Sequence, residues 1–178
     1  MLRSSLILAV LPAILPIALQ ADVASDMTLE SEDVVSDILD IVGKDADHFL
    51  AEPISVSMSE GRVQTLTLDF GEDMANHEYV IAGSTSGVFP GTNLGSISVP
   101  LNYDSYTDLL LQRLDSELFP GFKGRLDSKG QATAQVKLPE DLSEKLVGSV
   151  FFHSAIIFDA KTGKPELASE IAELVLVP

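Results

Sequence analysis

Alternation of apolar and polar residues with a period of two constrains this chain more than any other feature, because it starts near Ile54 and recurs to the end of the sequence. It is clear in residues 54–58 and again in residues 66–70, on either side of a turn at Glu60-Gly61. Such alternation is typical of strands with one buried face. We therefore predict that these two segments pair as a β-hairpin.

Further strands are expected along the rest of the chain, separated by turns rich in Gly, Pro and Asp. Asp127-Ser128-Lys129-Gly130 has the composition of a tight turn, with Asp127 starting it through an Asx-type hydrogen bond, and the strands flanking it are expected to form a second hairpin. Residues 150–158 are apolar on both faces and predict a central, doubly covered strand. The expected strands are residues 78–82, 97–101, 122–126, 132–138, 150–158 and 171–177.

Residues 104–118 are ambiguous. Tyr106, Leu110 and Leu114 have helical spacing, whereas Tyr106-Thr107 and the run of leucines at 109–111 suit a strand, and we favour the strand. Residues 139–146 predict one or two helical turns. A short helix is also expected between Ser31, which can cap it, and Gly43.

Eight or nine short strands without long crossover helices predict an all-β fold. The fold class we expect is an antiparallel, immunoglobulin-like β-sandwich, accompanied by the short N-terminal helix. The expected organisation is a signal peptide over residues 1–21, an N-terminal extension over 22–53 and the sandwich domain over 54–178.

The first 21 residues have the order of a secretory signal. Arg3 precedes an apolar run from Leu6 to Leu19, and Ala21 stands before acidic residues as a cleavage site. Pro12 and Pro16 interrupt the run, which is shorter than the roughly 20 residues of a membrane span. We expect a secreted product, extracellular, at the cell surface or periplasmic, with no membrane span after cleavage.

Several segments together resemble a known module. They are GRVQTLTLDFG, EYVIAGSTSGVFPGTNL, SVPLNYDSYT, GRLDSKGQATAQVKLP, VGSVFFHSAIIFD and ASEIAELVLVP. Their order is similar to that of an uncharacterised β-sandwich module in exported proteins of environmental bacteria, over roughly residues 54–178. The most specific pieces, around Pro90-Gly91-Thr92 and Leu126-Asp127, are turn and core residues. The resemblance implies a fold, an exported setting and a partnering or structural role, but no catalytic or ligand-binding position.

Charge narrows the range of partners. Without Arg3 the chain has 10 basic and 27 acidic residues, a formal charge of −17. Nucleic acids and anionic membranes bind through Lys and Arg, so both are disfavoured. The acidity indicates either solubility or divalent cation binding.

No motif for catalysis emerges. Gly83-Ser84-Thr85-Ser86-Gly87 has Thr where a nucleophile elbow needs Ser. His48, His77 and His153 lack a second His or Cys at zinc-ligand spacing, and His153 is expected to be a core histidine that donates to a backbone carbonyl. The absence of Trp and the presence of only three Tyr argue against a sugar site, and no phosphate-binding glycine motif is present.

Calcium is the cofactor left open, because loops of a sandwich can supply the six to eight oxygens it needs. Solvated acidic loops are the alternative at each position. The candidate ligands are Asp45, Asp47, Glu72, Asp73, Asn102, Asp104 and Asp108.

Three functions follow as hypotheses. The first is a non-enzymatic exported interaction or structural module, whose partner is an extracellular or periplasmic protein or matrix component. The alternatives are a calcium-dependent adhesion or matrix module, and a small secreted hydrolase whose site is not visible in sequence.

Overall fold

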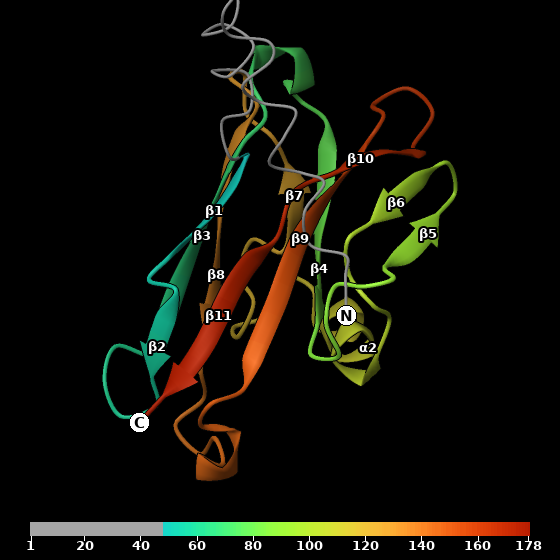
Figure 1. The fold of residues 1–178 in the computed structure, drawn as a ribbon. Coiled ribbons are helices and arrows are strands. Elements are labelled where there is room, and N and C mark those ends of the chain that lie inside the picture. Colours follow the sequence, from blue (N-terminus) through green and yellow to red (C-terminus); the bar gives the residue numbers. More distant parts are fainter. Residues whose placement is uncertain (1–47) are drawn as a thin grey trace, which may run out of the picture. The chain divides into compact units, whose positions relative to one another are not determined.

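The computed structural model describes residues 48–178, so the predicted signal peptide and the helix expected at 31–43 lie outside the described residues. Eleven strands, one α-helix and two short 3-10 helices follow one another along this part of the chain (Figure 1). Their bounds are β1 Phe49–Glu52, β2 Ser55–Ser57, β3 Val63–Asp69, η2 Glu72–Met74, β4 Glu78–Ser84, β5 Thr92–Leu94, β6 Ile97–Val99, α2 Ser105–Gln112, β7 Lys123–Arg125, β8 Gln131–Lys137, η3 Glu144–Leu146, β9 Val150–Phe158, β10 Pro165–Ala168 and β11 Ala172–Val177. The prediction of a mostly β domain is confirmed.

The strands form two main sheets and a separate hairpin. One sheet has the order β1-β3-β8, and the other has the order β2-β11-β9-β4-β7 with β10 added to β9. The β5–β6 hairpin stands apart from both. All pairs are antiparallel except β2 with β11, so the larger sheet is mixed where the sequence predicted antiparallel pairing throughout.

One apolar core is shared by both sheets. Leu66 and Leu68 of β3 are fully buried in the same cluster as Ile81 of β4 and Ile157 of β9. Gln64 of β3, which is also buried, joins the sheets by donating from Nε2 to the carbonyl oxygens of Pro53 and Glu173. The alternation in β3 and β8 therefore has the predicted effect, because the apolar side chains on one face of each strand point into the core.

Strand β9 is the central strand that the sequence predicted. It pairs with β4 along its length, with β11 through residues 150–153, and with β10 through residues 156–158. Ala155 and Ile157 face the shared core, whereas Ile156 packs with Val99 and Leu101 on the opposite face. Both faces of β9 are thus covered by apolar residues.

Both predicted hairpins are wrong. Segment 54–58 contributes β2, which pairs with β11, while β3 pairs with β1 and β8. Segments 122–126 and 132–138 contribute β7 and β8, which pair with β4 and β3 respectively and so lie in different sheets. Alternation indicated the strands, but their partners are selected by the shared core, which the local pattern does not report.

The prediction of a strand within residues 104–118 is also wrong, because Ser105–Gln112 is the α-helix α2. Asp104 caps it: its carboxylate accepts the N–H groups of Tyr106 and Thr107, and the Thr107 hydroxyl accepts the N–H of Asp104 in return. Leu110 is fully buried against the core. A cap and a helically spaced apolar face together outweigh the strand propensity of the tyrosine and threonine.

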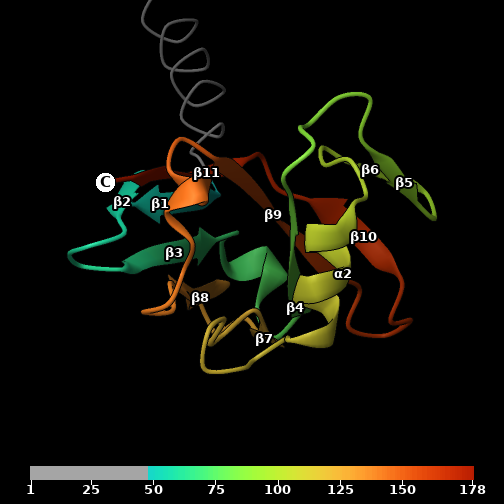
Figure 2. The same cartoon turned by 90° about the horizontal axis from the view of Figure 1, so that it is seen from below.

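Helix α2 and the β5–β6 hairpin lie on the same side of β4 in both views (Figures 1 and 2). Gly83 permits the close approach of the helix, because a Cβ there would lie 2.6 Å from Leu110 Cδ1 and 2.7 Å from Tyr106 Cε1.

The domain predicted to start at residue 54 also includes β1, which begins at Phe49. Among residues 48–178 no helix has the length and apolar character needed to span a bilayer.

Candidate functional site

An apolar groove opens on the face of the larger sheet that is turned away from the shared core. Its volume is about 270 Å³. The floor comes from β4 and β9, one side from the β5–β6 hairpin, and the other from α2 and the residues that follow it. The lining residues are Val80, Ala82, Thr92, Leu94, Val99, Leu101, Asn102, Tyr103, Thr107, Leu111, Leu114, Ile156 and Phe158.

Side chains at the rim of the groove leave apolar surface in water. Leu111 is 45% exposed, Leu94 38% and Tyr103 60%. The Phe89 side chain, 86% exposed, extends from the neighbouring loop. That loop is tied to the groove by Asn102, whose amide nitrogen donates to the carbonyl oxygens of Ser86 and Phe89. Exposed apolar side chains that line one groove make it a candidate interaction site.

The polar groups in the wall are occupied by bonds within the protein. The Thr92 hydroxyl donates to the Leu101 carbonyl at 2.7 Å, and the Thr107 hydroxyl donates to the Gly83 carbonyl at 2.6 Å. The Asn102 side-chain oxygen accepts the N–H of Gly91. The groove therefore offers an occupant shape and apolar contact in place of directed hydrogen bonds.

Asp104, a predicted calcium ligand, lies at the end of β4, where donors surround its carboxylate. Its Oδ2 accepts the N–H groups of Thr85 and Ser86, each at 2.8 Å, and the hydroxyls of Ser84 and Thr85. Its Oδ1 caps α2. Partial burial alone would raise the pKa of Asp104, but the N–H groups of Thr85, Thr107 and Ser86 outweigh it and lower the pKa well below its usual range.

Asp104 and its two neighbours from the same predicted set thus brace the loops around the groove. Asn102 holds the loop that contains Phe89 and Gly91, and Asp108 accepts a hydrogen bond from the Tyr103 hydroxyl. Segment Gly83–Gly87, which has Thr85 where a nucleophile elbow needs Ser, runs from the end of β4 into a loop and binds the Asp104 carboxylate.

His153 is the buried histidine that the sequence predicted, but its partner is a side chain. Nε2 lies 2.9 Å from the Tyr106 hydroxyl, and Nδ1 has no hydrogen-bond partner within the described part of the chain. Burial lowers the pKa of His153 to about 3, so the ring is neutral. Burial and the nearby Asp104 carboxylate raise the pKa of Tyr106, which keeps its proton.

The remaining predicted residues are dispersed. Glu72 and Asp73 form the start of η2, and Asp45 and Asp47 lie outside the described residues. His48 is hydrogen-bonded through Nδ1 to the Asp69 carbonyl and stacks on Phe70. The Asx turn predicted at Asp127 is confirmed, since its Oδ1 accepts the N–H groups of Lys129 and Gln131.

A cluster that the sequence analysis missed lies at the other end of β4. His77, Asp159 and Glu166 each turn a ligand atom toward the others, and these atoms all lie within 4.8 Å of one another. His77 Nε2 is 3.4 Å from Glu166 Oε2. His77 is far in sequence from Asp159 and Glu166, which flank the turn between β9 and β10. The three meet only through the pairing of β4, β9 and β10, so spacing along the chain gave no signal.

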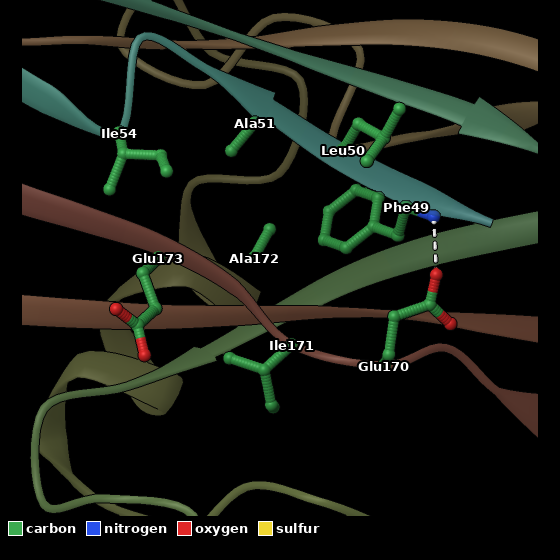
Figure 3. A pocket seen from close by; sticks show the side chains of 8 residues that line it. All are labelled: Phe49, Leu50, Ala51, Ile54, Glu170, Ile171, Ala172 and Glu173. Carbon is green, nitrogen blue, oxygen red and sulfur yellow. Dashed lines mark hydrogen bonds between the residues drawn. The ribbon is translucent and has the colours of Figure 1, made fainter. Parts of the chain in front are cut away.

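A second pocket, of about 280 Å³, separates β1 from the chain that leads into β11 (Figure 3). Glu170 points to the N-terminal end of β1, where its Oε1 accepts the N–H of Phe49 at 2.8 Å. Leu50 and Ile54 lie along the β1 side of this pocket. The carboxylate satisfies an edge N–H that would otherwise face the gap between the two sheets.

Among residues 48–178, none of the three histidines is hydrogen-bonded to a serine, so the described residues bring no Ser–His pair together. Of the two pockets, the apolar groove has the more uniformly apolar lining, and it is taken as the candidate functional site. No protein-family model, curated protein or solved structure matches this chain.

Proposed function

We propose that this chain is an exported interaction module, and that its groove receives the apolar side chains of a protein partner. The observation that carries the proposal is the apolar groove between α2 and the β5–β6 hairpin, together with its exposed rim. A pocket of this size accommodates one or two aliphatic or aromatic anchor side chains. Such anchors, seated in water-excluding pockets, supply most of the binding energy of protein interfaces.

The proposed fold is an immunoglobulin-like β-sandwich. In that fold the first, second and fifth strands lie side by side in one sheet, which the fourth strand extends, and the third, sixth and seventh strands form the other. The order β1-β3-β8 matches the first set if β1 and β2 are two halves of one first strand. The order β11-β9-β4 then matches the second set. Modules of this kind commonly present their loops and faces to partners.

Charge defines the partner further. The chain has a net charge of −16, and Asp108 on α2 lies beside the groove-lining residues Thr107 and Leu111. A partner segment with apolar anchors flanked by Lys or Arg is attracted to this surface, whereas an acidic segment is repelled. The predicted signal peptide supports an exported partner protein.

The test uses a synthetic helical peptide of Leu and Lys as the probe, with methyl NMR of the purified chain as the measurement. We expect the peptide to shift the methyl signals of Leu94, Leu111 and Ile156, and the Leu111→Lys variant to lose this response. Val147→Lys is the matched control, because Val147 is 40% exposed, close to the 45% of Leu111, but lies outside the groove.

Two further peptides separate shape from charge. A Ser/Lys peptide keeps the charge but has no anchors, and a Leu/Glu peptide keeps the anchors with the opposite charge. Equal binding of the Ser/Lys peptide, or unchanged binding of the Leu/Lys peptide to Leu111→Lys, would show that the groove is not the site and would overturn the proposal.

A further inference from the structure

A second site, independent of the groove, is set by the ends of three neighbouring strands. Phe158 of β9 is paired with Glu78 of β4 on one side and with Pro165 of β10 on the other. His77 therefore directly precedes β4 and Asp159 directly follows β9 at the same level of the sheet. Glu166 is the extra residue of a bulge in β10, between Pro165 and Leu167. Bulges commonly redirect a side chain next to a functional site.

The backbone around His77 is held in place. Its N–H donates to the Met74 carbonyl, and its own carbonyl accepts the N–H of Leu126. The imidazole is mostly covered, with 17% of its side chain exposed. Its Nδ1 faces the Ala75 carbonyl at 3.4 Å, which favours the proton on that nitrogen and directs the Nε2 lone pair toward Glu166. A carbonyl on the far ring nitrogen is the usual support of a histidine that binds metal.

The carboxylates are free to bind a cation. Oδ1 of Asp159 accepts the N–H groups of Lys161 and Thr162, which orient the group. Lys161 and Lys164 are in the adjoining turn, yet within residues 48–178 neither forms an ion pair with Asp159 or Glu166.

We propose that His77, Asp159 and Glu166 form a binding site for one zinc ion, with water as the fourth ligand. Two ligand atoms about 2 Å from a tetrahedral ion lie about 3.3 Å apart, which is close to the 3.4 Å between His77 Nε2 and Glu166 Oε2. One imidazole and two carboxylates suit zinc and related transition metals, whereas calcium prefers oxygen ligands alone. The bound ion links the ends of β4, β9 and β10.

The test is calorimetric titration of the untagged chain with zinc chloride, followed by cobalt chloride as an optical probe. We expect one zinc ion per chain, a rise in the melting temperature, and cobalt absorption in the visible range typical of a low-coordinate site. Because Glu166 is exposed and makes no backbone hydrogen bond in the cluster, Glu166→Gln should fold normally and weaken zinc binding at least about tenfold.

His77→Gln should weaken zinc binding by a similar factor. His48→Gln and Glu144→Gln are the controls, since each removes the same chemical group away from the cluster, and both should bind zinc as the unsubstituted chain does. The proposal is overturned if millimolar zinc gives no binding, if both Glu166→Gln and His77→Gln bind unchanged, or if calcium binds equally well with the same dependence on these variants.

Discussion

The two ends of strand β4 carry polar clusters of opposite character. At the C-terminal end the Asp104 carboxylate accepts hydrogen bonds from four backbone N–H groups and from neighbouring hydroxyls. At the N-terminal end Glu166 Oε2 lies 3.4 Å from His77 Nε2, and ligand atoms of three residues point toward a shared space. Satisfied donors and acceptors fix a structure, whereas convergent groups with free lone pairs can bind something else. Mutations at the C-terminal end of β4 should therefore change the free energy of unfolding, and mutations at the N-terminal end should change ligand binding.

The largest change in the free energy of unfolding is expected at the C-terminal end of β4, where the hydrogen-bond donors and acceptors are satisfied. Asp104→Ala removes the helix cap, leaves the Thr85 N–H without its acceptor and leaves the Ser86 N–H with only the Ser84 hydroxyl, which should lower the free energy of unfolding by about 3 kcal/mol. Urea denaturation measures it. Asp108→Ala, an exposed acid in the first turn of the same helix, should cost less than about 1 kcal/mol. If Asp104→Ala and Asp108→Ala lowered the free energy of unfolding equally, the hydrogen bonds of Asp104 would not be a special source of stability.

Acid should weaken the same end through His153. The ordinary histidine pKa is about 6.5 and the folded value is about 3, so between these values the unfolded state binds more protons and stability falls as the pH falls. From pH 6 to pH 4 this amounts to about 2 kcal/mol. Denaturation across this range in the parent and in His153→Gln measures the contribution, and an NMR titration of the ring tests its cause directly. A His153 ring that titrates near pH 6 would contradict the prediction.

A smaller loss is expected for Tyr106→Phe. The hydroxyl is the partner of His153 Nε2, and its removal leaves both ring nitrogens without a partner among the described residues. The cost of one such unmade bond is about 1 kcal/mol. The comparison is with Tyr103→Phe, which loses a hydrogen bond to Asp108 at the exposed surface and should stay near the parent midpoint in urea.

The smallest change in stability is expected at the N-terminal end of β4, beside the His77, Asp159 and Glu166 cluster. Without zinc, Glu166→Gln should alter the free energy of unfolding by less than about 0.5 kcal/mol, because Glu166 is exposed and water replaces its contact with His77. With zinc, the parent should gain stability that this variant lacks. A large loss in the absence of metal would mean that the cluster at this end is structural, as Asp104 is.

Much of the local structure could be predicted from the sequence. The alternation at β3 and β8, the apolar run of β9 and the Asp127 turn each follow from side-chain chemistry within a few residues. Helix α2 was missed although Asp104 and Thr107 have the spacing of a capping pair, because the tyrosine and leucines that follow also suit a strand. A local sequence pattern predicts a helix or strand well where it fits only one type of secondary structure.

Pairing and the sites could not be predicted in the same way. Two segments with good alternation fit many partners, and the actual choice depends on which apolar faces fill one core. His77, Asp159 and Glu166 are ordinary surface types in sequence, and only the register of three strands and one bulge makes them neighbours. The groove likewise depends on where α2 and the β5–β6 hairpin stand relative to β4.

The parallel pairing of β2 with β11 has a mechanical consequence. The chain enters β2 at Ser55 and leaves β11 at Val177, so tension applied to the two flanking segments pulls these strands in opposite directions along their shared axis. Their backbone bonds, extended by the bond from the Met58 N–H to the Val177 carbonyl, are then loaded in shear together and do not open one after another. A module held between two anchoring points would carry load at this short patch and at the β1–β3 pairing, which lies between β2 and the N-terminal anchoring point.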